Sequence, residues 1–280
     1  MLNTLTIDLE DYFHVSNFEG HIPRNRWEVM PLRIEESTMK VLELLSLYRI
    51  RATFFVLGWI AERMASLIRK IRSEGHEIAS HGYDHRLAYE MSPEEFRADI
   101  RKSKSAIEDA IGESICGYRA TSYSIIRRNL WCLQILSEEG FLYDSSIFPV
   151  FHDRYGVPAW DRFPKLVKGN NFSIFEVPPS TLKIFGYNLP IAGGGYLRLF
   201  PIQFIAYCIK RINMVENNPA VVYFHPWELD PEQPRMNLSF VKAFRHYNNL
   251  SNTANKVAFL LKNFKFSSIS EIFNIKNGKL

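Results

Sequence analysis

The hydrophobic and polar positions of the chain switch repeatedly between a strand period and a helix period. Short runs rich in β-branched and aromatic residues predict strands, and each run is followed by a longer segment with apolar residues at helical spacing. One such segment begins with Ser, Pro and Glu at the spacing of a capping box, which predicts a helix start. The predicted strands of this part are 2–9, 51–58, 76–81, 114–120 and 141–146, and the predicted helices are 34–48, 59–75, 92–112 and 125–140.

The regular alternation stops over residues 146–200. This stretch is rich in Pro, Gly and aromatic residues, so we interpret it as long loops with short strands. Successive strand–helix units predict an α/β fold, a distorted (β/α) barrel of about seven parallel strands. Residues 1–280 show no linker or repeat, so we expect one domain with this loop-rich insertion. Beyond the insertion the pattern predicts a helix at 201–216, a strand at 219–226, a helix over roughly 238–263 and a short strand and helical turn at 264–273.

The charge balance and the cysteines narrow the classes of function. Lys and Arg number 34 and Asp and Glu 30, a net charge of +4 without a basic tract, so we expect no nucleic-acid partner. The three cysteines are widely spaced in apolar contexts, which favours reduced thiols and a cytoplasmic location. We find no signal-peptide pattern and expect no transmembrane segment. A peripheral contact with a membrane surface and the oligomeric state stay open.

Three carboxylates stand within four positions where the first predicted strand ends: Asp8, Glu10 and Asp11. Clustered acids repel one another and lose hydration when they are buried, so they require a cation, a proton or a positive side chain nearby. In a parallel α/β barrel, the side chains at the carboxyl ends of the strands converge on the face that carries the active site. The compensating groups are therefore expected at the other strand ends.

The segment "SHGYDH" places His81 and His85 four residues apart, directly after a predicted strand. Neutral imidazoles at short spacing suit Zn, Fe, Co or Ni. Two polar loop histidines would give the same pattern, and the pair alone is a weak signal. Ionisable side chains at several other strand ends strengthen the metal interpretation. These are Arg119 in "GYRATSYS", Asp144 in "YDSS" and His225 in "VVYFHPWE".

Five ordered motifs resemble those of the polysaccharide deacetylases, the NodB-homology domain of carbohydrate esterase family four. They are "TIDLED", "SHGYDH", "YRATSYS", "YDSS" and "YFHPWE", and together they extend over nearly the whole chain. The runs "DLEDYFHV", "DSSIFP" and "GGGYLR" are most similar to the cytoplasmic subtype encoded with exopolysaccharide and exosortase gene clusters. The resemblance implies a NodB-like barrel and an enzyme that removes N-acetyl groups from amino sugars.

The resemblance also implies how the site residues divide the chemistry. A carboxylate and the two histidines, His81 and His85, would hold one divalent metal, with zinc as the expected ion and Co, Ni or Fe as alternatives. Asp8 would act as the general base on water and would pair with Arg119. His225 would protonate the departing amine of the sugar.

The resemblance implies two further parts of the site, and two positions depart from the usual family pattern. Asp144 would help to fix the charge of His225, and a backbone N–H of the loop 119–123 would complete the oxyanion site. The third motif usually has proline where this chain has Thr121, which loosens the expected oxyanion geometry. Tyr223 replaces a small apolar residue and is expected to narrow the acetyl pocket.

The carboxylate ligand is open between two residues. The common family form has adjacent aspartates, base then ligand, whereas here Asp8 is followed by Leu9, Glu10 and Asp11. Strand alternation puts Asp8 and Glu10 on one face, which favours Glu10. If the strand ends at Leu9, the turn presents Asp11 instead. We slightly prefer Asp11, because the aromatic run after it suggests a loop that folds over the site.

Four residues are candidates for contact with a sugar: Tyr123 and Trp227 within the motifs, and Tyr196 and Arg198 in "GGGYLR". The glycines of that run allow close approach of the backbone to a ligand. A flexible hairpin explains the same run equally well.

Three functions fit this sequence. The first is a metal-dependent hydrolase of carbon–nitrogen bonds other than peptide bonds, which removes N-acetyl groups from a polysaccharide or glycan precursor. The second is a related metal amidohydrolase that opens a cyclic amide, as an allantoinase does. The third is a glycan-binding protein with impaired catalysis. The first is preferred, because the candidate base and the candidate acid are both present.

Overall fold

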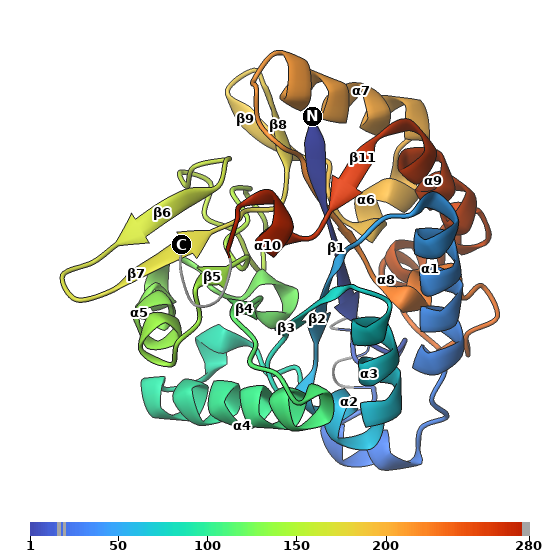
Figure 1. The fold of residues 1–280 in the computed structure, drawn as a ribbon. Coiled ribbons are helices and arrows are strands. Elements are labelled where there is room, and N and C mark those ends of the chain that lie inside the picture. The colour runs from blue at the N-terminus through green and yellow to red at the C-terminus, as the bar shows by residue number, and fades with distance from the viewer. Residues whose placement is uncertain (16–17, 19–20, 276–280) are drawn as a thin grey trace.

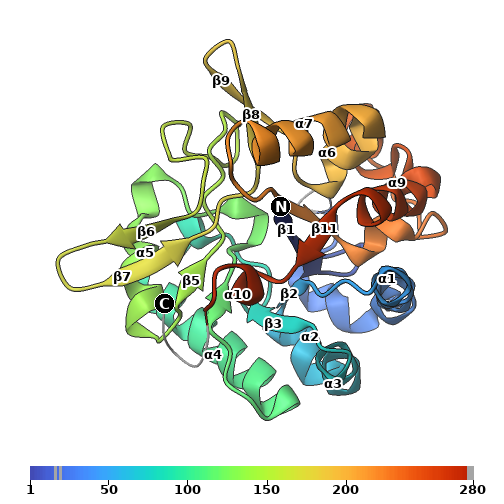
Figure 2. The same ribbon diagram turned by 45° about the horizontal axis from the view of Figure 1, so that its top comes forward.

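The computed structural model describes residues 1–15, 18 and 21–275. A mostly parallel sheet runs through the middle of these residues, and helices surround it (Figures 1 and 2). A separate antiparallel hairpin is formed by β8 (Thr181–Ile184) and β9 (Tyr187–Pro190). The strands of the main sheet are β1 (Leu2–Leu9), β2 (Thr53–Val56), β3 (Glu77–Ser80), β4 (Gly117–Tyr118), β5 (Tyr143–Asp144), β6 (Lys165–Lys168), β7 (Ser173–Glu176), β10 (Val221–Phe224) and β11 (Lys265–Ser267).

The sheet has the strand order β10-β1-β2-β3-β4-β5-β7-β6, and β11 pairs with the first residues of β1. The seven strands from β10 to β7 are parallel to their neighbours, and β6 is antiparallel to β7. The predicted α/β class with a parallel sheet is therefore confirmed. Among the described residues no ladder joins β7 to β10, so the barrel is open there. Ser180 contacts β10 at this gap: its N–H donates to Val221 O at 3.1 Å, and its side-chain Oγ accepts from Val221 N at 2.7 Å.

The helices lie between the strands along the chain. The α-helices of the described residues are α1 (Ile34–Tyr48), α2 (Gly58–Arg63), α3 (Ala65–Ser73), α4 (Pro93–Ile111), α5 (Trp131–Glu138), α6 (Gly194–Leu199), α7 (Ile202–Met214), α8 (Phe240–Tyr247), α9 (Leu250–Asn263) and α10 (Ile269–Ile272). The 3-10 turns are η2 (Arg24–Val29), η3 (Ala88–Glu90), η4 (Thr121–Tyr123), η5 (Arg127–Asn129) and η6 (Pro226–Leu229). Within this part of the chain, none of the helices combines the length and apolar character that a membrane span requires.

Elements with strong local signals have the predicted bounds, and elements without them differ. The helix α4 starts with the predicted capping box, in which Ser92 Oγ accepts from Glu95 N and Glu95 Oε2 accepts from Ser92 N. The helix predicted over 59–75 is instead two helices, α2 and α3, because the backbone at Met64 leaves the helical region. The long helix near the end is also broken, into α8 and α9, where Asn249 adopts φ 55°. The short strands β6 to β9 agree with the loops and short strands expected over 146–200, whereas the helix α6 was not expected there.

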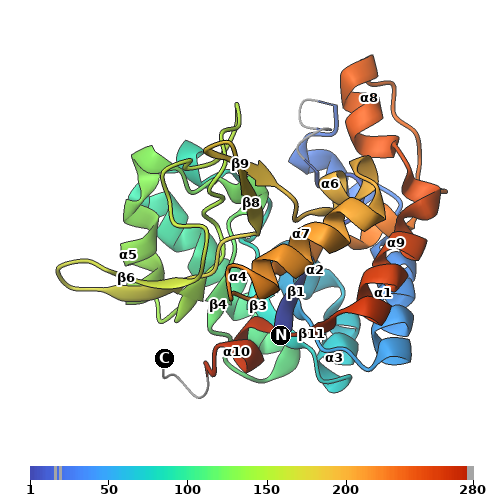
Figure 3. The ribbon, with the colours of Figure 1, turned by 90° about the horizontal axis from the view of Figure 1, so that it is seen from above.

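The strand β1 lies at the centre of the molecule and is buried along almost its whole length. In Figure 3, α5 and β6 lie on one side of β1, and α1, α8 and α9 lie on the other. Because β2 and β10 flank it in the same direction, the carboxyl end of β1 meets the ends of both neighbours. The chain thus brings residues 8–11 beside the loops that follow β3 and β10.

Candidate active site

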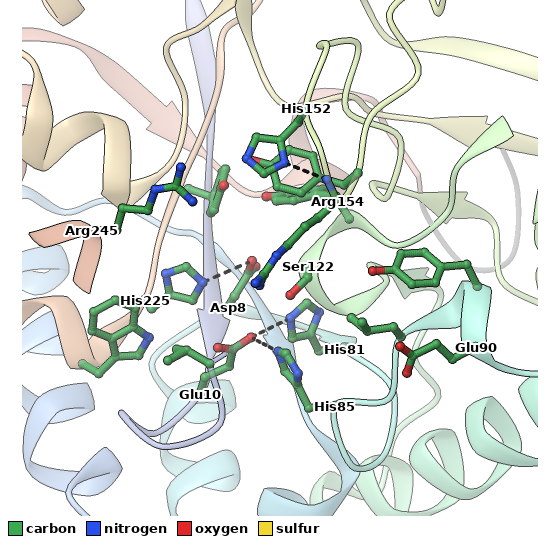
Figure 4. Close-up of a pocket in the computed structure, with 17 residues that line it drawn as sticks. Asp8, Glu10, His81, His85, Glu90, Ser122, His152, Arg154, His225 and Arg245 are labelled. Atoms are coloured by element: carbon green, nitrogen blue, oxygen red, sulfur yellow. Dashed lines mark hydrogen bonds and ion pairs between the residues drawn. The ribbon is translucent and has the colours of Figure 1, made fainter. Parts of the chain in front are cut away.

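A cavity of about 470 Å³ lies where the carboxyl ends of β1, β3 and β10 meet (Figure 4). This volume lies within the range of small-molecule binding sites. The residues lining it include Asp8, Glu10, His81, His85, Ser122, Tyr123, Tyr223, His225 and Trp227. Most of the ionisable residues expected at the strand ends therefore face one space.

Glu10, His81 and His85 form a group that could hold a metal ion. Glu10 Oε1 lies 3.0 Å from His81 Nε2 and 3.1 Å from His85 Nε2, and all three side chains are buried. His81 Nδ1 donates to the backbone carbonyl of Arg119 at 2.8 Å. Because Nδ1 is occupied, Nε2 is the nitrogen that faces the carboxylate, and a proton or a cation is required between these two acceptor atoms.

The charge of Glu10 fits the same interpretation. Burial alone would raise its pKa, but the charge of His85 and hydrogen bonds from His81 and His85 hold the pKa well below its ordinary value. A buried carboxylate together with two imidazoles is a donor set that divalent Zn, Co, Ni or Fe accepts. The residues present therefore fit the expected metal.

Asp11 lies outside this group, and the preference for Asp11 over Glu10 is corrected. Asp11 Oδ2 accepts from the backbone N–H groups of Arg33 and Ile34, at 2.8 and 3.0 Å, and Oδ1 accepts from Tyr12 N. Its carboxylate thus serves the unpaired donors at the start of α1. Burial raises the pKa of Asp11 to about 6, against these hydrogen bonds. Strand alternation, which favoured Glu10, was the better guide.

Asp8 is paired with Arg119, as expected. Arg119 Nη1 donates to Asp8 Oδ1 at 2.6 Å and to Thr6 Oγ1 at 2.8 Å. The guanidinium is fully buried, lies 4.1 Å from the ring centroid of Phe55, and donates through Nη2 to Ser145 Oγ. These contacts hold the Arg119 guanidinium in place, and its hydrogen bond in turn fixes Asp8 Oδ1. The other carboxylate oxygen, Oδ2, faces the cavity.

His225 faces Asp8 from the end of β10. Its Nε2 lies 3.9 Å from Asp8 Oδ2, and its Nδ1 lies 3.0 Å from Glu228 Oε2. Its ring stacks on Trp227, with centroids 5.3 Å apart. Burial lowers the pKa of His225, but the hydrogen bond with Glu228 and the charges of Glu10, Glu228 and Asp8 raise the pKa to about 9. The imidazole is thus held protonated at neutral pH.

The carboxylate that holds His225 is Glu228, which corrects the expectation for Asp144. Asp144 accepts hydrogen bonds from both the hydroxyl and the N–H of Ser146 and lies against Glu176. Burial raises the pKa of Asp144, and burial and the charge of Asp144 raise that of Glu176. No interaction of the described residues joins Asp144 to His225. The "YDSS" motif instead supports the loop of Arg119, because Ser146 Oγ accepts from Ala120 N at 2.7 Å.

Arg198 does not face a ligand, which corrects its expected contact with sugar. Its side chain is buried, and Nε donates to Glu228 Oε1 at 2.8 Å. Its other nitrogens donate to backbone carbonyls of residues 245, 246 and 248. Burial would raise the pKa of Glu228, but the charge of Arg198 and the hydrogen bond with His225 lower it to about 2. Arg198 therefore fixes the carboxylate that fixes His225.

The run "GGGYLR" forms α6 and packs directly on this carboxylate. A Cβ at Gly194 would lie 1.5 Å from Glu228 Oε2, so no other residue fits there without moving Glu228. Tyr196 lies outside the cavity lining, with its hydroxyl 3.3 Å from that of Tyr155. Tyr123 and Trp227, the other two candidates for sugar contact, line the cavity.

Three residues of the site had no role in the sequence-based prediction. Glu228 is buried behind His225 and lies outside the cavity lining; its place three residues after His225, in a 3-10 turn, was the only available signal for it. Arg154 and Arg245 line the cavity, and their positions carry no local signal. The predicted oxyanion donor in the loop 119–123 stays a prediction.

Comparison with known proteins divides the chain into two parts. Residues 27–140 match the family model of polysaccharide deacetylases, and residues 145–274 match a domain of unknown function, DUF3473. The first part of the chain is therefore similar to polysaccharide deacetylases. The candidate metal ligands His81 and His85 lie in the first part, whereas His225, Glu228 and Arg198 lie in the second.

Curated relatives match parts of this chain. A peptidoglycan deacetylase of Helicobacter pylori is 28% identical over 154 residues, 50% of this chain and 51% of that protein. A peptidoglycan-N-acetylglucosamine deacetylase of Bacillus cereus is 34% identical over 77 residues, 28% of each chain. The chain thus spans about half or less of the length of these relatives.

Solved structures share the fold over almost the whole chain. A protein of Mycobacterium smegmatis described as a polysaccharide deacetylase has a TM-score of 0.62 at 18% identity, covering 98% of this chain and 90% of that one. Puue allantoinase has a TM-score of 0.60 at 15% identity, covering 97% and 88%. At these identities the likeness shows the fold alone.

Proposed function

We propose that this protein is a metal-dependent N-deacetylase that removes acetyl groups from an amino sugar in a glycan or glycan precursor. The observation that carries the proposal is the placement of Glu10, His81 and His85 beside Asp8 and His225 in one cavity. The names of the curated relatives, which act on peptidoglycan and chitooligosaccharides, support a glycan substrate.

The triad would hold one divalent ion, for which we expect zinc. Such an ion, when bound, would polarise the acetyl carbonyl and favour attack by water. Asp8 accepts the proton of the attacking water at Oδ2, because Oδ1 is held by Arg119. Tyr123 and Trp227 offer ring surfaces at the cavity wall on which a sugar can lie.

His225 supplies the proton that lets the amine leave. Its Nδ1 is held by Glu228, which leaves Nε2 directed at the cavity and at Asp8. The raised pKa keeps this imidazole charged while the leaving nitrogen gains a proton. The base on β1 and the acid directly after the adjacent strand β10 therefore approach the same bond.

Acetate release from N-acetylated oligosaccharides, measured beside metal content, tests this proposal. We expect the His81→Ala protein to lose both the bound metal and the activity. The exposed His21 gives a matched control, and His21→Ala should keep both. Full turnover by a metal-free His81→Ala protein would contradict the proposal.

The two alternatives predict other results from the same preparation. Ring opening of allantoin without acetate release would identify an allantoinase-like amidohydrolase, which the shared fold does not distinguish. Glycan binding without turnover under any divalent metal would identify a binding protein with impaired catalysis. A cytoplasmic location and a link to exopolysaccharide synthesis stay predictions.

A further inference from the structure

The rim of the candidate active site carries two arginines that no step of the proposed reaction uses. Arg154 lies on the loop after β5, and Arg245 lies on α8, yet both line the cavity that contains Asp8 and His225. Figure 4 shows them on the side of the cavity where His152 lies, away from His81 and His85. Both side chains are exposed to solvent.

Neither guanidinium has an ion-pair partner among the described residues. In the described part of the chain, no ion pair includes Arg154 or Arg245, and no side-chain hydrogen bond occupies either group. The carboxylates on the floor of the cavity are engaged elsewhere, since Asp8 is bonded to Arg119 and Glu10 faces the two histidines. Unpaired surface arginines are common, but two that share a reaction cavity concentrate charge where a substrate must enter.

Both positive charges act on the same point of the rim. The ring of His152 stacks on Tyr155 at 3.8 Å, and burial lowers the pKa of His152. Asp153 raises this pKa, whereas the charges of Arg245 and Arg154 each lower it. Two guanidinium groups from separate elements therefore lie near enough to this imidazole to act on its charge, and Asp153 is the carboxylate that pairs with it.

We propose that Arg154 and Arg245 bind an anionic group of the substrate, a carboxylate or a phosphate, so that the preferred substrate is an acidic rather than a neutral acetylated glycan. Guanidinium groups bind both anions through paired N–H donors, and the bonds are stronger because both partners are charged. The subsite deepens the proposed deacetylase function and rests on it. The anion could be a uronic acid of the polymer or a phosphate that links a precursor sugar, and kinetics can separate these sources.

Three substrates of similar size test the subsite. One is neutral N-acetylglucosamine trisaccharide, the second alternates N-acetylglucosamine with glucuronate, and the third is N-acetylglucosamine bearing a phosphate ester. We expect KM for one anionic substrate to be about tenfold below that of the neutral one. A lower KM for the glucuronate oligosaccharide identifies a uronic acid as the anion, and a lower KM for the phosphate ester identifies a phosphate. Added salt should reduce the difference, because the two arginines are exposed.

Variants connect the preference to the residues. Arg154→Gln and Arg245→Gln should each raise KM for the anionic substrate about tenfold, leave kcat within about twofold, and leave the neutral substrate unaffected. Arg211→Gln is the matched control, because Arg211 lies on α7 outside the cavity. Equal KM values for all substrates, or an unchanged preference in the double variant, would overturn the subsite.

A binding measurement separates this proposal from the proposed function. Calorimetric titration of Asp8→Asn protein with the glucuronate oligosaccharide requires no turnover. Binding that is lost in the double arginine variant supports the subsite, even if the wild-type protein releases no acetate and the deacetylase function fails. Acetate release without any dependence on the arginines keeps the function and rejects the subsite.

Discussion

The two sides of the candidate active site are held in different ways. On the metal side, His81 and His85 follow β3 directly, and the backbone carbonyl of Arg119 orients His81. On the acid side, His225 is oriented by the side chain of Glu228, which is held in turn by Arg198 from α6. The metal side thus depends on the ends of the sheet, whereas the acid side depends on a chain of buried charges.

This difference gives the region of unknown function a structural role. The segment that matches it, 145–274, contains His225, Glu228, Arg198 and the helix α6 that packs on them. A buried charge is stable only when it is paired, so each member of the chain requires the next. Variants should therefore separate the two sides, because damage to one leaves a different property intact.

The largest effect is expected from the metal side. Glu10→Gln removes the negative ligand, so metal content should fall and acetate release should drop roughly a thousandfold or more. Elemental analysis and initial rates measure both. Asp11→Asn is the control: it should keep the metal and lose about 1 kcal/mol of unfolding free energy, because it weakens the cap of α1. Metal retained by Glu10→Gln and lost by Asp11→Asn would reverse the assignment.

On the acid side, Glu228→Gln should change the pH profile and lower kcat without loss of metal. The pKa of His225 is raised to about 9 partly by this carboxylate, so removing the charge lowers that pKa. The imidazole then loses its proton at a lower pH, so the alkaline decline of the pH profile of kcat shifts to lower pH. At neutral pH we expect kcat to fall about a hundredfold. Glu232→Gln, an exposed change nearby, should leave the profile in place.

A smaller effect is expected from the helix that supports this carboxylate. Gly194→Ala adds a methyl group where Glu228 Oε2 lies, so the carboxylate must move away from His225. We expect kcat to fall about tenfold, with metal content unchanged. At Gly195 a Cβ would meet nothing within 4 Å, which makes Gly195→Ala a matched control. Equal rates for both variants would show that the packing of α6 has no influence on the acid.

The smallest effect is expected away from both sides. Ser92→Ala removes the capping box of α4 and should lower the free energy of unfolding by about 1 kcal/mol, with unchanged kcat and KM. Chemical denaturation measures this change. Ser105→Ala, on an exposed position of the same helix, should cost less. A kinetic effect of Ser92→Ala would mean that the two sides depend on a wider part of the fold.

The sequence predicted those parts whose determinants are local. The bounds of β1, α1 and α4 follow from periodicity and caps, and His81 with His85 follows from spacing within one loop. The hydrogen bond from Arg198 to Glu228 joins residues 30 positions apart, and the sequence pattern did not predict the helix α6 that carries Arg198. Asp11 was misassigned for a related reason, since the N–H groups that engage it belong to residues 33 and 34.

The position of β1 between β2 and β10 has a consequence for synthesis and folding. Thr4 pairs with Val221, and Leu2 pairs with Lys265, so the first strand gains these neighbours only when the last quarter of the chain is available. Until then, one edge of β1 presents unpaired N–H and C=O groups, which other chains can pair with. Asp8 lies on this strand, and Glu10 directly follows its last residue. For most of its translation the nascent protein therefore has these two candidate site carboxylates at an open strand edge, and assembly of the candidate site is a late, long-range event.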